Sequence, residues 1–227
     1  MGPLPFGYDV INSVAVDNNG GVYTSGRGIY PGEDYYGNGG LTNMIVTRYS
    51  EAGDSLWTYR ISDSTDASMG FAIATRNGKV IAGGFKTDTA YADENLFMMV
   101  TDTAGNGLHE WNHNGKGAGV THGQILKVDA ADNIYCASTV KRSDWIGWDV
   151  VIVKYDPAGT LLWEKYYSSY GWNNDTITNM ELTPSGDLVM VISTDSAQTN
   201  SNYKMSLVRM NSNGNFWTPH GFSLLLR

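Results

Sequence analysis

Apolar and polar residues alternate in short runs along this chain, and the same arrangement occurs four times. The first copy reads VAVDNNGGVYTSG from Val14, where two β-type runs flank a turn rich in Asn and Gly. Two such runs around a short turn of this composition indicate a β-hairpin. The aligned apolar positions of the second run are Val22, Val80, Ile134 and Leu188. They are 58, 54 and 54 residues apart, so the hairpin belongs to a repeat.

A second hairpin follows each first one and ends in a tryptophan. The four tryptophans are Trp57, Trp111, Trp163 and Trp217, spaced by 54, 52 and 54 residues. Runs such as MIVTRY and VVIVKY are apolar without clean alternation, which favours strands covered on both faces. Two hairpins make four strands per repeat, and a four-stranded unit of this period is typical of a β-propeller blade.

We therefore predict an all-β fold, a single β-propeller domain over residues 1–227 with about four blades of four antiparallel strands. The predicted blades cover approximately residues 10–66, 67–119, 120–176 and 177–227. They either close into a ring or form an open arc that pairs with a second copy or belongs to a larger propeller. An open arc would expose apolar faces on its first and last blades, so a homodimer through those faces is one alternative.

The third repeat carries a family resemblance. DVVIVKYDPAGTLLWEKYY followed by TNMELTPSGDLVMVIST resembles the SBBP-type bacterial β-propeller repeat, with its D-P-x-G turn and aromatic strand end. The resemblance covers nearly the whole chain but rests on turn residues, so it implies no catalytic residue. It does imply an exported bacterial protein, extracellular or at the cell surface, although the start MGPLPFGYDV has no secretion-signal pattern.

Composition removes several classes of partner. The formal net charge is -8, and the 15 Lys and Arg are scattered, which argues against nucleic acid. No stretch approaches the roughly 18 apolar residues of a membrane span. Cys136 is the single cysteine, so the chain has no internal disulfide.

His109-Glu110-x-x-His113 matches the zinc-protease signature, which works only on a helix. The repeat places these residues on the last strand of the second blade, beside Trp111. Four strand steps separate the two histidines by roughly 13 Å, and Glu110 then points to the opposite face. We therefore predict an ordinary strand, no metal site and no cofactor.

The connections opposite the tight turns are longer and differ from one another, and loops of that kind are where binding usually occurs. They are rich in aromatic residues, and the candidate binding residues among these are Tyr35, Tyr36, Trp145, Trp148, Tyr170 and Trp172. Aromatic rings beside Asp, Asn and Gly suit a glycan or a peptide, because the ring stacks while polar groups bond hydroxyls or amides. The alternative is that these rings pack over neighbouring blades.

Carboxylates gather on the same loops, and they are Glu33, Asp34, Asp63, Asp66, Asp93, Glu94, Asp144 and Asp175. Two of them at the right separation would support glycoside hydrolysis, and three could bind calcium. No EF-hand pattern is present, and solvated loop acids are the commoner outcome.

Four aligned positions on the first strand of each blade are polar or small, as a wet central channel requires: Asn12, Gly70, Gln124 and Thr178. We take Asn12 and Gln124 as further candidate binding residues. The leading hypothesis is a non-catalytic module that recognises a glycan or a protein through the aromatic loops. The alternative is a carbohydrate-active enzyme, a hydrolase or lyase, that uses the loop carboxylates.

Overall fold

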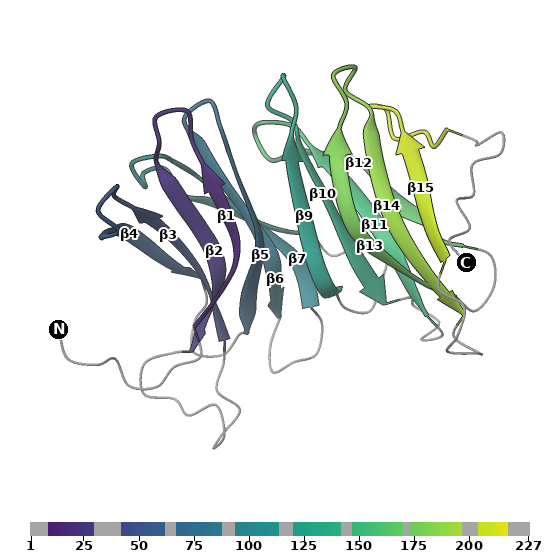
Figure 1. Cartoon of the computed structure of the whole chain (residues 1–227), viewed down its shortest axis with the longest axis horizontal. Helices are drawn as coiled ribbons and strands as arrows, with labels where there is room; N and C mark the ends of the chain where they lie inside the picture. The colour runs from purple at the N-terminus through teal and green to yellow at the C-terminus, as the bar shows by residue number, and fades with distance from the viewer. Residues whose placement is uncertain are drawn as a thin grey trace. The chain divides into compact units, whose positions relative to one another are not determined.

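The computed structural model of the chain describes residues 9–29, 42–61, 67–87, 94–113, 120–141, 147–169, 173–196 and 204–217. Within these ranges the regular structure is entirely β, arranged as four antiparallel sheets of sequentially neighbouring strands (Figure 1). The predicted all-β class and the predicted order of strands are confirmed. None of the described segments is a helix that could cross a membrane.

Each sheet is a simple meander, so every strand pairs with its neighbours in the chain. The first sheet consists of β1 (Val10–Val16), β2 (Val22–Ile29), β3 (Thr42–Tyr49) and β4 (Ser55–Ile61). The second consists of β5 (Ser68–Arg76), β6 (Lys79–Thr87), β7 (Glu94–Asp102) and β8 (His109–His113). The third consists of β9 (Val120–Val128), β10 (Ile134–Lys141), β11 (Trp148–Tyr155) and β12 (Leu161–Tyr167). The fourth consists of β13 (Asn173–Leu182), β14 (Leu188–Ser196) and β15 (Lys204–Met210).

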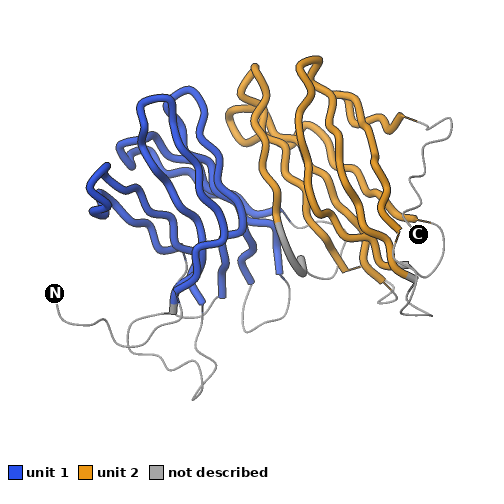
Figure 2. Tube along the Cα trace, viewed as in Figure 1, with its two compact units in different colours: residues 1–113 blue, residues 114–227 orange. Residues whose placement is uncertain are grey.

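The chain divides into two compact units of two sheets each (Figure 2). Unit 1 is Met1–His113 and holds the first and second sheets, and unit 2 is Asn114–Arg227 and holds the third and fourth. The blade bounds stay a prediction, and β13 begins at Asn173, ahead of the predicted boundary at 177. A single propeller domain over residues 1–227 stays a prediction.

The core of unit 1 lies between its two sheets. Side chains that alternate along the strands meet there, because successive residues of a strand point to opposite faces. The buried members of this core are Tyr23, Met44, Val46, Ile61, Ile73, Val80, Ala82, Phe97 and Met99. Trp57, Tyr59 and Leu108 pack against its margin.

The core of unit 2 is built in the same way between the third and fourth sheets. Its buried members are Tyr135, Ala137, Val150, Ile152, Ile177, Met180, Leu188, Met190, Ile192 and Met210. Along β11, Val150 to Tyr155 are all buried, as the largely apolar run VVIVKY predicts for a strand covered on both faces.

Two details differ from the repeat. The fourth sheet has three strands in the described part of the chain, extended by a single bridge between Met210 and Phe216. The tail from residue 218 lies outside the described residues. Trp57 pairs with Arg48 and Trp163 pairs with Lys154, and each of these partners stands two residues before the turn that ends its strand. Trp111 instead pairs with Met98, which stands four residues before the turn that ends β7. The equivalence expected for Trp111 is therefore wrong.

The two extra residues of the second repeat explain this shift. His109 takes the pairing position of the other tryptophans by facing Val100, and Trp111 follows two pairs further along β8. Leu108, one residue before the strand, packs against the core of unit 1 instead.

Candidate functional site

The meander gives each unit two chemically different ends. Tight turns join β1 to β2, β3 to β4 and their counterparts, and we call this the turn end (Figure 1). The connections from β2 to β3, from β4 to β5 and their counterparts lie at the other end, which we call the loop end. The sequence predicts binding at the loop end and only backbone geometry at the turn end.

At the turn end, an Asp or Asn begins most turns and holds the turn through its side chain. The Oδ1 atoms of Asp17, Asp129 and Asp156 each accept two backbone N–H groups, two and four residues on, at 2.8 to 2.9 Å. Bonds from N–H groups stabilise the ionised carboxylate. The pKa of Asp156 is lowered in this way, chiefly by the Thr160 N–H. These residues shape turns and need no ligand.

Two of these aspartates also belong to a contact that joins the sheets of a unit. In unit 1 the Tyr23 hydroxyl donates to Asp17 Oδ2 at 2.7 Å, and the Arg48 guanidinium lies 5.7 Å from the Tyr23 ring centre. Burial and the bond to Asp17 raise the pKa of Tyr23 to about 12, and the same bond is the main cause of the lowered pKa of Asp17. Arg48 Nη1 and Trp57 Nε1 both donate to the Thr103 carbonyl of the second sheet, at 2.7 and 3.2 Å.

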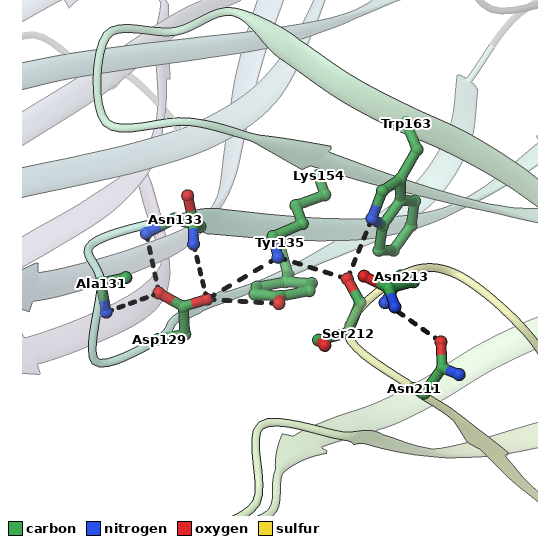
Figure 3. Close-up of polar contacts among 9 residues, drawn as sticks. All are labelled: Asp129, Ala131, Asn133, Tyr135, Lys154, Trp163, Asn211, Ser212 and Asn213. Carbon is green, nitrogen blue, oxygen red and sulfur yellow. Dashed lines mark hydrogen bonds and ion pairs between the residues drawn. The ribbon is translucent and has the colours of Figure 1, made fainter.

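Unit 2 repeats the arrangement with other residues (Figure 3). The Tyr135 hydroxyl donates to Asp129 Oδ2 at 3.3 Å, and Lys154 Nζ lies 4.8 Å from the Tyr135 ring centre. Lys154 Nζ and Trp163 Nε1 both donate to the Ser212 carbonyl of the fourth sheet, at 3.3 and 3.1 Å.

We call this arrangement the tryptophan contact: a cation and a tryptophan of one sheet on a turn carbonyl of the next. Its members are Arg48, Trp57 and Thr103 in unit 1, and Lys154, Trp163 and Ser212 in unit 2. Sequence reasoning missed it because the turn end was interpreted as plain. The available signal was a cation recurring two residues before the turn in three of the four repeats. The contact holds the two sheets of a unit together.

At the loop end, each first strand of a sheet has an irregular register near the predicted polar positions. The shifts fall at Ile11/Ser13 in β1, at Gly70/Ala72 in β5, opposite Ser138 to Val140 in β9 and at Ile177/Asn179 in β13. β-Bulges of this kind bend a strand and redirect a side chain.

The structure brings two of the four polar positions together. Asn12 Nδ2 donates to the Gly70 carbonyl at 2.7 Å, which ties the first sheet to the second. A Cβ on Gly70 would lie 2.2 Å from Ser25 Oγ, so the close approach of the sheets requires glycine there. In unit 2, Gln124 is buried and Thr178 Oγ1 donates to the Val191 carbonyl at 2.9 Å. Asn12 therefore has a structural bond, and its role and that of Gln124 in binding stay predictions.

Among the predicted aromatic residues, Trp148 is described. It begins β11, is partly exposed, and pairs across the sheet with Lys141, whose Nζ lies 5.9 Å from its ring centre. A partly exposed indole beside a cation at the loop end suits stacking on a sugar ring. The other predicted aromatic residues lie outside the described residues: Tyr35, Tyr36, Trp145, Tyr170 and Trp172.

Asp175 is the buried carboxylate of the loop end. Its Oδ1 accepts the Thr194 hydroxyl and its Oδ2 accepts the Ser169 N–H, each at 2.5 Å. Next to it, Asn174 Nδ2 donates to Asp195 Oδ1 at 2.8 Å. Both oxygens of Asp175 are thus engaged, so this carboxylate fixes the connection from β12 to β13.

Glu94 is the other predicted carboxylate that the structure describes. It begins β7 at the loop end and is half-buried, and desolvation raises its pKa. A carboxyl group with a raised pKa keeps its proton at higher pH and can act as a general acid. The remaining predicted carboxylates lie outside the described residues: Glu33, Asp34, Asp63, Asp66, Asp93 and Asp144. The described side chains form no cluster of three or more groups that could hold a metal ion.

The histidine pair lies where the sequence predicts, on a strand. His109 and His113 are the two ends of β8, opposite Val100 and Leu96. A single ion cannot bridge positions at the two ends of a strand of this length, so the helical zinc-protease geometry is excluded.

Comparison with known proteins places the fold. No protein-family model and no curated protein matches the sequence. Among solved structures, the α-L-arabinanase of Penicillium chrysogenum in complex with arabinobiose aligns over 90% of this chain and 64% of its own, with a TM-score of 0.56 and 10% identity. An endo-arabinase of Bacteroides thetaiotaomicron aligns over 96% and 82%, with a TM-score of 0.53 and 12% identity.

A protein of unknown function from Dyadobacter fermentans aligns over 95% of this chain and 70% of its own, with a TM-score of 0.58 and 12% identity. Identities this low concern the fold alone. This chain also spans less than two thirds of the length of the arabinanase. The four meander sheets and this likeness together define an all-β protein of the β-propeller class.

Proposed function

We propose that this chain is a carbohydrate-active β-propeller that holds a glycan at the loop end of its sheets. The carrying observation is the fold shared over 90% and 96% of the chain with an arabinanase and an endo-arabinase. A further similar structure is an α-L-arabinofuranosidase from Fusarium graminearum with an iminosugar inhibitor, which aligns over 93% of this chain and 72% of its own, with a TM-score of 0.56 and 9% identity. Arabinose oligosaccharides are therefore the first ligands to test.

Trp148 supports glycan binding, because a partly exposed ring at the start of β11 offers an apolar face for stacking. We expect Trp148→Ala to weaken binding of arabinobiose or a longer arabinose oligosaccharide at least tenfold in calorimetry. Trp217→Ala is the matched control, since Trp217 is exposed at the turn end. Equal affinity in wild type and Trp148→Ala would contradict this assignment.

Glu94 supports a catalytic role, because glycoside hydrolysis uses a carboxylic acid of raised pKa to protonate the leaving oxygen. General acid catalysis contributes about 10²- to 10⁴-fold, so Glu94→Gln should reduce sugar release by roughly that factor while binding persists. The control is Asp54→Asn, which changes an exposed carboxylate at the turn end. Activity that survives Glu94→Gln would remove Glu94 from the mechanism.

The second candidate is a glycan-binding module without catalysis. Asp175 favours it, because a buried carboxylate with both oxygens bonded stabilises a loop and is poorly placed to transfer protons. Binding without release of reducing sugar from a panel of polysaccharides would support the module over the enzyme. We further propose an extracellular or cell-surface setting in a bacterium, on the basis of the resemblance to SBBP-type repeats.

A further inference from the structure

The fourth sheet exposes apolar residues on the face turned away from the core of unit 2. Leu207 is 62% exposed and Met205 is 49% exposed, although other residues of β15, such as Met210, belong to the core. Leu207 stands four residues before the turn that follows its strand, as Val46 and Ile152 do in the first and third sheets, and those two side chains are fully buried. This face therefore has the composition of a surface that another sheet covers.

The same face carries a third set of tryptophan-contact donors. Arg209 stands two residues before the turn, as Arg48 and Lys154 do, and it stacks 4.7 Å from the ring centre of Trp217. Asp187 holds the guanidinium through bonds of 2.6 and 3.0 Å. Trp217 is 55% exposed. In the described part of the chain, no turn carbonyl of a following sheet meets this pair.

The first sheet offers the matching acceptor. Its turn between β3 and β4 has the same spacing as the turns of Thr103 and Ser212, which makes Glu51 the equivalent residue. The glycine two residues after the acceptor, by contrast, has different surroundings in the first sheet than in the second and fourth sheets. A Cβ on Gly105 would lie 3.1 Å from Trp57 and one on Gly214 would lie 3.1 Å from Trp163.

Gly53 is the equivalent of Gly105 and Gly214, with φ +85°, and a Cβ there would meet no described atom within 4 Å. The apolar face beside it is also open. Val14 pairs with Thr24, as Ile73 pairs with Ala82, and Val14 is 61% exposed whereas Ile73 is 8% exposed. The first sheet thus has the acceptor side of a tryptophan contact without its donor.

We propose that the fourth sheet of one copy packs on the first sheet of a second copy, with Arg209 and Trp217 donating to the Glu51 carbonyl and the indole covering Gly53. The chemistry is that of the contacts already present inside each unit, so no new type of recognition is required. The exposed Glu51 carboxylate adds a charge complementary to Arg209. The contact is head-to-tail, because the two copies contribute different surfaces.

The experiment measures the mass of the whole chain by native mass spectrometry and sedimentation. Wild type should be a dimer or a larger head-to-tail assembly. Leu207→Glu removes the donor face and Val14→Glu removes the acceptor face, and each alone should give a monomer. Both side chains are largely exposed in the single chain, so neither substitution should prevent folding.

Mixing the two variants is the decisive step. The Val14→Glu copy keeps a normal fourth sheet and the Leu207→Glu copy keeps a normal first sheet, so one contact can form and association should return. Leu162→Glu is the matched control, because Leu162 is 50% exposed and lies on β12 of the third sheet. A monomeric wild type, an assembly that survives either substitution, or a mixture that stays monomeric would overturn the proposal.

Discussion

The tryptophan contacts of the two units have the same design but different strengths. Unit 1 uses an arginine 2.7 Å from its carbonyl and a tyrosine–aspartate bond of 2.7 Å, whereas unit 2 uses a lysine at 3.3 Å and a bond of 3.3 Å. The tryptophan distance differs least between the units, at 3.2 and 3.1 Å from the carbonyl. The indole therefore defines the contact, and the polar groups around it vary.

The largest effect should come from removing the indole. Trp57→Ala and Trp163→Ala each leave a cavity and remove one of the two donors to the turn carbonyl, and we expect each to lower the free energy of unfolding by about 3 kcal/mol. Urea denaturation followed by far-ultraviolet circular dichroism measures the loss. Trp217→Ala should cost less than about 0.5 kcal/mol when the copies are apart, because the side chain is mostly exposed. Equal losses at all three sites would mean that burial does not define the contact.

A smaller effect should distinguish the two tyrosines. Tyr23→Phe removes a short bond to a charged carboxylate and should cost about 1.5 kcal/mol. Tyr135→Phe removes the longer bond and should cost about 0.5 kcal/mol. Both rings stay in place, so the comparison isolates the hydroxyl groups. A larger loss for Tyr135→Phe would reverse the ranking of the two contacts.

The smallest effect concerns pH. The pKa of Asp17 is lowered in the folded state, first by the Tyr23 hydroxyl and then by backbone N–H groups. In the folded protein, Asp17 therefore takes up its proton at a lower pH than in the unfolded chain, where aspartates titrate at about 3.9. The stabilisation is present above that value and is lost as pH falls below it. In urea midpoints measured from neutral to acid pH, Asp17→Asn should flatten this decline, and an unchanged profile would contradict the assignment.

Much of the sheet architecture could be predicted from the sequence, because each turn is marked by residues whose chemistry is local. Gly20, Gly53 and Gly186 have positive φ where the pattern places a turn, and β8 covers the segment from His109 to His113. The position of Trp111 could not be predicted, because two inserted residues can extend a turn or shift a strand, and the repeat pattern alone does not decide between them.

The candidate site was less predictable. Trp148 could be placed at the loop end because it begins a strand of clear pattern. The engagement of Asp175 with Thr194 and Ser169 could not, since Thr194 faces Asp175 only because a register shift between Ile177 and Asn179 changes the pairing of β13 with β14. Loop carboxylates look alike in a sequence, whereas burial and hydrogen bonding make Glu94 and Asp175 chemically different.

The acceptor in each tryptophan contact is a main-chain carbonyl two residues before a glycine, and every chain has a carbonyl at that place in the turn. A sheet with a cation and a tryptophan can therefore receive any neighbour that keeps the glycine, whatever its other side chains are. Duplicating the first or the third repeat in the gene would thus place a complete contact between the new neighbours without compensating substitutions, whereas the second sheet has Val100 and His109 in the donor positions and could not supply it.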